Sequence, residues 1–240
     1  MFLQDVKIVL CRASGAANVG AICRVIKNMG LSELRLAAPQ PLDTEKITTM
    51  AVNSADIWKK ACFFDSLAES VADCSIVVGT TRRRGHDRKS VSMSPRALSE
   101  WLAQRPGQAA IVFGNERTGL EAEELDVCNF ASHIPVSDAQ PSLNLSHAVQ
   151  IYAYELFLAL EKQNPVKGDW QPMNQTEVLA LVKLITGTLA DLGFYCKPGR
   201  EGQELFLRDV ISRAGLADRE GAYLKNIFVK AARLGSMRKS

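Results

Sequence analysis

Short apolar runs alternate with helical patterns along the first two thirds of the chain, and this alternation limits the possible folds more than any other feature. An apolar run bounded by turn residues is typical of a buried strand, whereas apolar residues three or four apart are typical of a helix. Strands are predicted at residues 6–10, 34–37, 62–64, 75–79, 111–113 and about 132–136. Because strands that alternate with helices form parallel sheets with helices on both faces, we predict an α/β fold.

Polar residues mark the expected starts of several helices between these strands. Asn18, Ser66 and Ser94 each stand just before a helical pattern, where a side-chain oxygen can accept a backbone N–H. Residues 44–60 are also predicted to be helical, and a long helix is expected through residues 149–160.

The alternation stops near residue 165, where prolines and glycine follow one another closely. Beyond that point the pattern is helical, over residues 176–192, 204–214 and 223–234. We therefore predict an α/β domain over residues 1–164, a linker over 165–173 and a helical extension over 174–240. So small a helical piece has little core of its own, and we expect it to pack on the first domain or on a partner subunit.

Composition excludes several classes of protein. In 240 residues no apolar run approaches the roughly 20 needed to span a bilayer, and the first residues lack the pattern of a signal peptide. The six cysteines include no CxxC pair and there are only three histidines, so no metal site is predicted. We expect reduced, mostly buried thiols and a cytoplasmic protein with no membrane partner.

The net charge of +3 is unevenly distributed. Residues 82–89 carry a local charge of +4 and residues 195–240 carry +5, which leaves −6 for the remainder. Either segment alone is readily explained as solvated surface, but two basic segments on an acidic body favour a polyanion partner such as RNA. The candidates for phosphate contacts are Arg82, Arg83, Arg84, Arg88 and Lys89 in the loop, and Lys225, Lys230, Arg233, Arg238 and Lys239 in the tail.

The predicted strand at 111–113 runs into an unusually polar loop, Gly114-Asn115-Glu116-Arg117-Thr118-Gly119. Loops at the carboxyl ends of parallel strands are where open α/β sheets bind ligands. The glycine spacing matches a phosphate-binding P-loop, but Leu120 stands where a P-loop has its lysine. We therefore expect a ligand site here, and not one for ATP phosphates.

Two other loops carry polar side chains whose role has more than one explanation. One is the segment 18–24, which contains Asn18 and Arg24, and the other is 140–146, which contains Ser142 and Asn144. Helix capping explains either asparagine, and a surface ion pair is the usual fate of an arginine. A loop carboxylate in water is the corresponding plain explanation for Glu116.

Taken together, the three loops resemble the three motifs of the SpoU-type RNA ribose 2′-O-methyltransferases of the SPOUT class, in that family's order. The motifs are Asn18-Val19-Gly20-Ala21-Ile22-Cys23-Arg24, Ile111-Val112-Phe113-Gly114-Asn115-Glu116-Arg117-Thr118-Gly119-Leu120, and Ile134-Pro135 with Ser142-Leu143-Asn144-Leu145-Ser146. The stretch Ile76-Val77-Val78-Gly79-Thr80-Thr81 and the helical extension are similar to the bacterial TrmJ-like branch. That branch methylates the ribose of nucleotide 32 in the tRNA anticodon loop.

The resemblance implies a trefoil knot in the C-terminal part of the α/β domain, a feature that strand patterns alone cannot reveal. It implies S-adenosylmethionine as the methyl donor and a homodimer whose substrate pockets are completed across the interface. The chain has no GxGxxG sequence, which argues against an unknotted Rossmann-type methyltransferase. The cofactor-binding positions that it implies are Gly79, Thr80, Thr81, Gly114, Asn115, Gly119, Ile134, Ser142 and Leu143.

The resemblance also makes Arg24 the central catalytic residue, supported by Asn18, Glu116, Ser142 and Asn144. A guanidinium with a pKa above about 12 is a poor base. We therefore expect Arg24 to bind the phosphate beside the target ribose and to polarise its hydroxyl, with Glu116 orienting the guanidinium or contacting the nucleotide.

Two alternatives stay open. One keeps the chemistry and changes the substrate to ribosomal RNA. The other is a non-catalytic RNA-binding protein with this fold, against which the intact set of polar site residues argues.

Overall fold

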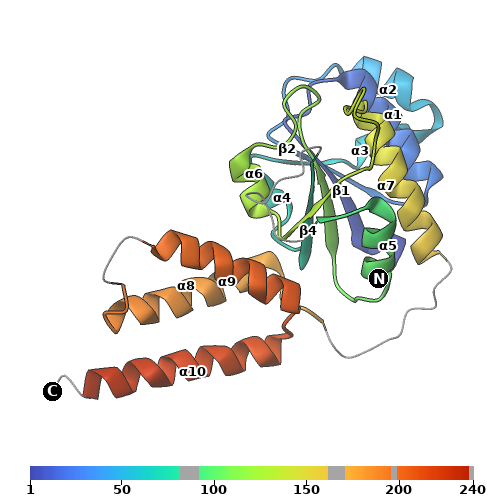
Figure 1. The fold of residues 1–240 in the computed structure, drawn as a ribbon. Coiled ribbons are helices and arrows are strands. Elements are labelled where there is room, and N and C mark those ends of the chain that lie inside the picture. Colours follow the sequence, from blue (N-terminus) through green and yellow to red (C-terminus); the bar gives the residue numbers. More distant parts are fainter. Residues whose placement is uncertain (82–91, 162–170, 196–198, 238–240) are drawn as a thin grey trace. The chain divides into compact units, whose positions relative to one another are not determined.

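The computed structural model describes residues 1–81, 92–161, 171–195 and 199–237 (Figure 1). Within these residues, seven parallel strands form one sheet. The chain divides into two compact units, Met1–Lys167 and Gly168–Ser240. The first unit holds the sheet, whose order is β3-β2-β1-β6-β4-β7-β5 with every pair parallel, so the predicted α/β class is confirmed. The strands are β1 Val6–Cys11, β2 Glu33–Ala37, β3 Cys62–Phe64, β4 Ile76–Thr80, β5 Ser92–Met93, β6 Ala109–Phe113 and β7 Phe130–Ser132.

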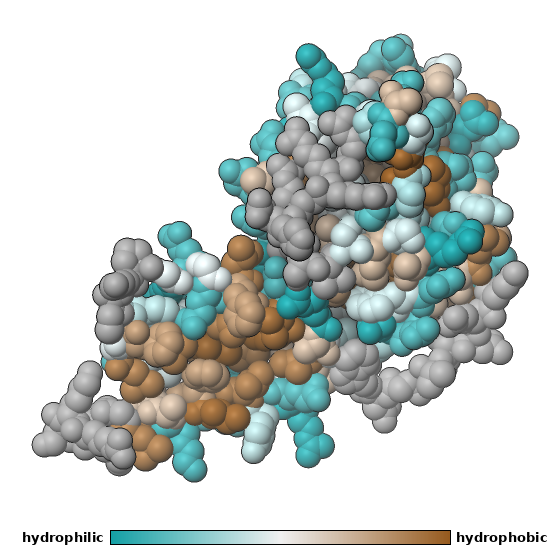
Figure 2. Space-filling model, viewed as in Figure 1, coloured by the Kyte–Doolittle hydropathy of each residue, from teal (hydrophilic) through white to brown (hydrophobic). Residues whose placement is uncertain are grey.

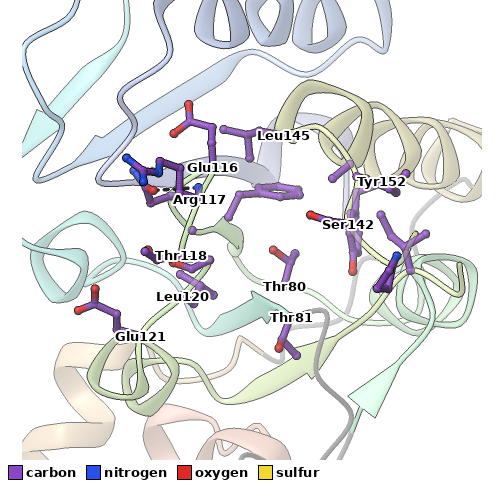
Figure 3. Close-up of a pocket in the computed structure, with 18 of the residues that line it drawn as sticks. Thr80, Thr81, Glu116, Arg117, Thr118, Leu120, Glu121, Ser142, Leu145 and Tyr152 are labelled. Atoms are coloured by element: carbon purple, nitrogen blue, oxygen red, sulfur yellow. Dashed lines mark hydrogen bonds between the residues drawn. The ribbon is translucent and has the colours of Figure 1, made fainter. Parts of the chain in front are cut away.

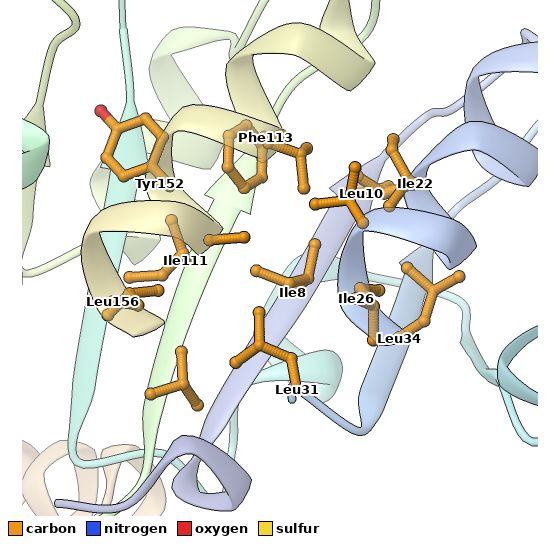
Figure 4. Close-up of a cluster of buried hydrophobic side chains, with 14 of the residues drawn as sticks. Ile8, Leu10, Ile22, Ile26, Leu31, Leu34, Ile111, Phe113, Tyr152 and Leu156 are labelled. Carbon is orange, nitrogen blue, oxygen red and sulfur yellow. The ribbon is translucent and has the colours of Figure 1, made fainter. Parts of the chain in front are cut away.

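Helices cover both faces of this sheet. After the short 3-10 turn η1 Leu3–Asp5, the helices of the first unit are α1 Ala16–Asn28, α2 Thr44–Ala51, η2 Val52–Ser54, α3 Ala55–Lys59, α4 Leu67–Ser70, α5 Pro95–Ala103, α6 Ala122–Val127 and α7 Leu145–Leu160. The larger core contains Ile8 and Leu10 of β1 packed against α1 and α7 (Figure 4). The alternate residues of β1, Val9 and Cys11, lie in a second core with residues of α4 and α6. This division follows from the period of two along a strand.

Two predicted elements differ in the structure, and one observed strand was not predicted. The strand expected near residues 132–136 is β7, Phe130–Ser132, because it lies between two partners and Pro135 has no N–H for an interior ladder. The helix expected over 44–60 is broken at Val52, because its φ of 52° is incompatible with the interior of a right-handed helix. The edge strand β5 was not predicted, because two residues carry no periodic signal.

The second unit contains the helices α8 Gln175–Asp191, α9 Arg200–Ala214 and α10 Asp218–Met237. Val178, Val182 and Ile185 of α8 form its small core with Ile211 of α9. Figure 2 shows that apolar residues also gather on the surface of this unit. Among the residues that the structure describes in this unit, the large exposed apolar ones are Leu179, Phe194, Phe206, Tyr223, Ile227 and Leu234.

Two further expectations concern the whole chain. The trefoil knot implied by the resemblance stays a prediction. Within the four described stretches, no helix combines the length and the apolar character that crossing a bilayer requires.

Candidate active site

The loops that follow β1, β4, β6 and β7 meet at the carboxyl edge of the sheet. The chain proceeds from β1 to β2 on one side, whereas β6 and β4 lie on the other side of β1. Such a reversal opens a crevice beyond the strand ends, and this is where open α/β sheets bind ligands. A cavity of about 700 Å³ lies here, and residues of the loops after β4, β6 and β7 line it (Figure 3).

Eight of the nine predicted cofactor positions line this cavity. They are Thr80, Thr81, Gly114, Asn115, Gly119, Ile134, Ser142 and Leu143. The ninth, Gly79, does not line it. A Cβ at Gly79 would meet Cys128 Sγ at 2.9 Å and Leu125 Cδ2 at 3.0 Å, so close packing explains that glycine.

The loop after β6 is folded tightly back on itself at Gly114. A Cβ there would lie 2.1 Å from the Gly119 carbonyl carbon and 2.2 Å from the Leu120 nitrogen, so only glycine fits. The Gly119 N–H donates to the Asn115 carbonyl at 2.8 Å, and Gly119 has a φ of 72°. Two glycines at these positions therefore give the loop its shape, and the backbone itself forms part of the cavity wall.

Glu116 lies at the N-terminal end of α1, not beside Arg24. Its carboxylate accepts hydrogen bonds from the Ser14 N–H at 3.3 Å, the Ser14 hydroxyl at 3.1 Å, the Gly15 N–H at 3.0 Å and Asn18 Nδ2 at 3.4 Å. Partial burial acts to raise the pKa of Glu116, but hydrogen bonds from backbone and side chains outweigh it and hold that pKa below its usual value. Glu116 is therefore an ionised acceptor at neutral pH.

A chain of side-chain hydrogen bonds joins the three loops. Asn18 Oδ1 accepts from Asn144 Nδ2 at 3.0 Å, while Asn18 Nδ2 donates to Glu116. Asn144 also caps α7, because its Oδ1 accepts from the Ser146 N–H at 2.8 Å. The capping role expected for Asn18 is wrong, since α1 begins at Ala16 with Gly15 as its N-cap.

Arg24 stands apart from this chain. It lies on α1 with an exposed side chain, it does not line the cavity, and among the described residues it forms no hydrogen bond or ion pair. Asn18 and Arg24 are six residues apart on a helix, which turns them about 120° from each other. Since no described residue of the chain pairs with the guanidinium of Arg24, this group can contact another molecule.

The predicted phosphate contacts fall in two groups. Arg82, Arg83, Arg84, Arg88 and Lys89 lie outside the described residues, as do Arg238 and Lys239. Lys225, Lys230 and Arg233 lie on α10, and all three side chains are at least partly exposed.

Sequence reasoning missed Arg12, which follows β1. Its guanidinium pairs with both oxygens of Glu124, at 2.7 and 2.9 Å, and with Glu121 at 2.9 Å. The hydrogen bond to Glu124 is the main reason that the pKa of Arg12 is raised. Glu121 is the N-cap of α6 and Glu124 lies in its first turn, where the helix dipole favours carboxylates. Since this already explains both glutamates, nothing in the sequence indicated that Glu124 has an arginine partner 112 residues away.

The buried ring of Tyr152 was also missed as part of the cavity wall. It packs edge-on against Phe113 with ring centroids 5.4 Å apart, and its hydroxyl donates to Ser132 Oγ at 2.8 Å. Burial raises the pKa of Tyr152 far above its usual value, so the hydroxyl stays protonated. Its role in the wall depends on α7 packing across the ends of β6 and β7.

Comparisons with known proteins agree with this site. Residues 5–154 match the model of the SpoU rRNA Methylase family. The chain is 39% identical over 166 residues to an uncharacterized tRNA/rRNA methyltransferase of Haemophilus influenzae, covering 69% of this chain and 68% of the relative.

Two further relatives extend the likeness to the helical unit. The tRNA (cytidine/uridine/adenosine-2′-O-)-methyltransferase TrmJ of Pseudomonas aeruginosa is 31% identical over 248 residues, covering 97% of this chain and 95% of that protein. The crystal structure of TrmJ from Z. mobilis has a TM-score of 0.78 at 27% identity, covering 94% of this chain and 98% of that one. A family match over more than half of the chain, on the same loops that form the cavity, shows that this protein belongs to the SpoU methylase family.

Proposed function

We propose that this protein is an S-adenosylmethionine-dependent tRNA ribose 2′-O-methyltransferase that modifies nucleotide 32 of the anticodon loop, at cytidine or uridine. The hydrogen-bonded chain Asn144–Asn18–Glu116 beside the cavity carries the proposal, because it joins the three motifs of the family at one edge of the sheet. The activity named for the Pseudomonas relative, which covers nearly the whole chain, supports tRNA and the ribose hydroxyl. Nucleotide 32 comes from the resemblance to the TrmJ-like branch.

The cavity suits a nucleoside-sized cationic cofactor. Its volume of about 700 Å³ lies within the range of small-molecule sites. Gly114 provides a backbone surface that a Cβ would fill. Even with Glu121 paired to Arg12, the described lining carries more carboxylates than cations. Glu116 and Glu123 outnumber Arg117 there, and this excess favours a positively charged ligand. When bound, S-adenosylmethionine supplies an activated methyl group; the remaining tasks, orientation and charge, belong to the protein.

The polar residues divide these tasks. Arg24 binds the phosphate beside the target ribose in a bidentate manner and polarises the 2′-hydroxyl, because the planar guanidinium group has paired donors that match the geometry of a phosphate. Asn18 and Asn144 orient that hydroxyl and the loops around it. Glu116 positions Asn18 by accepting a hydrogen bond from its side-chain amide. Ser142 lines the cavity, where its hydroxyl can form a hydrogen bond with a ligand.

The position of Arg24 supports a homodimer. The side chain of Arg24 is exposed and does not line the cavity of its own chain. We infer that it serves the cavity of a second copy, so that each site combines Arg24 of one subunit with Asn18, Glu116 and Asn144 of the other. The expected compartment is the cytoplasm, where tRNA is modified.

The decisive experiment is a methyl-transfer assay on tRNA transcripts that differ at nucleotide 32. We expect transfer to a transcript with ribose at this nucleotide and none to a transcript with 2′-deoxyribose there. A transcript with 2′-deoxyribose at nucleotide 33 is the matched control and should remain a substrate. Transfer to the nucleotide-32 deoxy transcript would contradict the proposal.

Salt dependence tests the phosphate contacts separately. Affinity for tRNA should fall steeply as salt rises, and Lys225→Ala and Lys230→Ala should each reduce the log–log slope by about one if each side chain neutralises one phosphate. Affinity that barely changes with salt would contradict these contacts while leaving the chemistry untouched.

Ribosomal RNA is the second candidate substrate, supported by the family description and by the name of the Haemophilus relative. Mass spectrometry of nucleosides from tRNA and rRNA after deletion of the gene separates the two substrates. A non-catalytic RNA-binding role is the third candidate. Calorimetry in which the protein does not bind S-adenosylmethionine would favour that role.

A further inference from the structure

The side chain of Arg12 crosses from the end of β1 to the loop that follows β6. Besides its pairs with Glu124 and Glu121, its Nη2 donates to the Gly119 carbonyl at 2.9 Å and its Nη1 to Thr118 Oγ1 at 3.3 Å. Of these four partners, Thr118, Gly119 and Glu121 line the cavity, whereas Arg12 does not. The contacts through which Arg12 can shape the cavity wall therefore lie in this loop.

The backbone of Arg12 is held as firmly as its side chain. Its φ is 49°, in the left-handed region that L-residues disfavour. Its N–H donates to the Ala37 carbonyl at 2.9 Å, and its carbonyl accepts from Asn115 Nδ2 at 2.7 Å. Glycine would adopt this conformation without strain, so the presence of a strained arginine indicates that its side chain contributes something in return.

Arg12 and Glu116 fasten two different parts of the same loop. Glu116, which belongs to the first half, is held by Ser14 and Gly15. Arg12 holds the second half, residues 118–124, mainly through Glu124, whose side chain is 16% exposed, whereas the contacts with Thr118, Gly119 and Glu121 lie in more exposed positions. Without Arg12, the carboxylates of Glu121 and Glu124 would lose the cation that they share, and Glu124 would keep the Glu121 N–H, which donates to its Oε2 at 2.8 Å.

We propose that Arg12 is a positioning residue that holds residues 118–124 in the shape required to bind the methyl donor. The inference rests on the proposed function, because it assumes that this cavity receives S-adenosylmethionine. It assigns Arg12 no contact with the cofactor or the RNA. The loss of Arg12 should therefore weaken the binding of the methyl donor far more than it slows turnover once the donor is saturating.

The test compares Arg12→Ala with Arg12→Gly. In both variants we expect the Kd for S-adenosylmethionine, measured by calorimetry, to rise about tenfold or more, as befits the loss of charge-assisted hydrogen bonds. Arg12→Gly relieves the backbone strain, so its melting temperature should exceed that of Arg12→Ala. The two variants would then share the same loss of affinity for S-adenosylmethionine but differ in melting temperature. If Arg12 only stabilised the fold, affinity and melting temperature would change together. The kcat at saturating donor should stay within about twofold of wild type, since only uniform binding is lost.

Two additional variants complete the design. Glu124→Gln removes the same ion pair from the other side, and its effect on Kd should be much smaller in the Arg12→Ala background than in wild type. Arg96→Ala is the matched control, because Arg96 also pairs with a glutamate, Glu155, but lies outside the cavity lining. Its Kd should equal that of wild type.

The outcomes distinguish the two proposals. If wild-type protein does not bind S-adenosylmethionine, the proposed function fails and the role of Arg12 fails with it. If wild type binds and both Arg12 variants bind equally well, only the role of Arg12 is overturned. The same conclusion follows if the affinity of all the variants, Arg96→Ala included, simply tracks their melting temperature.

Discussion

The carboxylate of Glu116 occupies the N-terminal end of α1, a place that a capping side chain of the helix itself often takes. An anion is favoured there because the first N–H groups and the helix dipole both point toward it. Glu116 thus fixes the start of the helix that carries Asn18 and Arg24.

Glu116→Gln should lower the free energy of unfolding by about 1 kcal/mol at neutral pH, allowing for the partial exposure of the side chain. The pKa of Glu116 is lowered in the folded state, so this contribution is complete above its usual value near 4.5 and is lost as the pH falls through the lower folded-state pKa. Urea unfolding at several pH values should show the difference between variant and wild type shrinking below about pH 4.5. A difference that is independent of pH would contradict this role.

Gly114→Ala tests the fold of the loop itself. The new Cβ would lie 2.1 Å and 2.2 Å from backbone atoms of Gly119 and Leu120, so the loop must open to accept it. We expect binding of S-adenosylmethionine to fall by more than about tenfold, because a misplacement of about 1 Å in a site is that costly. Gly187→Ala in α8 is the control, since a Cβ there meets nothing within 4 Å, and its binding should be unchanged.

At the scale of elements, the N-terminus of α7 combines two roles in one side chain. Asn144 accepts from Ser146 through Oδ1 and donates to Asn18 through Nδ2. The first contact caps the helix, and the second connects it to the loop after β1.

Asn144→Asp should separate these roles, because aspartate keeps the capping oxygen and loses the donor. We expect its melting temperature to stay near that of wild type while methyl transfer falls at least about tenfold, whereas Asn144→Ala should also lose about 1 kcal/mol of stability. Thermal unfolding and the transfer assay measure the two effects. Near-normal transfer by Asn144→Asp would show that the contact with Asn18 is dispensable.

At the scale of the whole molecule, the proposed dimer makes a prediction about mixed subunits. Arg24→Ala and Asn144→Ala should each be inactive alone, since each lacks one half of every site. In a dimer that contains one subunit of each kind, one site carries both changes and the other carries none. Random reassociation of an equal mixture should therefore restore about a quarter of wild-type activity, as the statistics of a two-fold dimer require. Subunits that complete their own sites would give no recovery.

The sequence was sufficient for much of the fold and for most of the cavity wall. Five of the six predicted strands lie where expected, because apolar runs between turn residues report burial directly. The glycines at 114 and 119 were also informative, since a polar loop that follows a buried strand and is enclosed by two glycines is typical of a ligand site. Asn18, by contrast, is wrongly predicted to be a cap, because a local pattern cannot show that a carboxylate from the loop after β6 serves the same helix end.

By itself, the sequence determined the α/β class, the family and the loops that surround the cavity, because these depend on local periodicity and on short motifs. Only the tertiary structure decided which side chains meet. It joined Glu116 to Asn18 and Asn18 to Asn144, it separated Arg24 from all three, and it brought Arg12 to Glu124. The physical reason is that a parallel sheet places the ends of β1 and β6 side by side although about a hundred residues separate them, and no periodicity along the chain encodes that pairing.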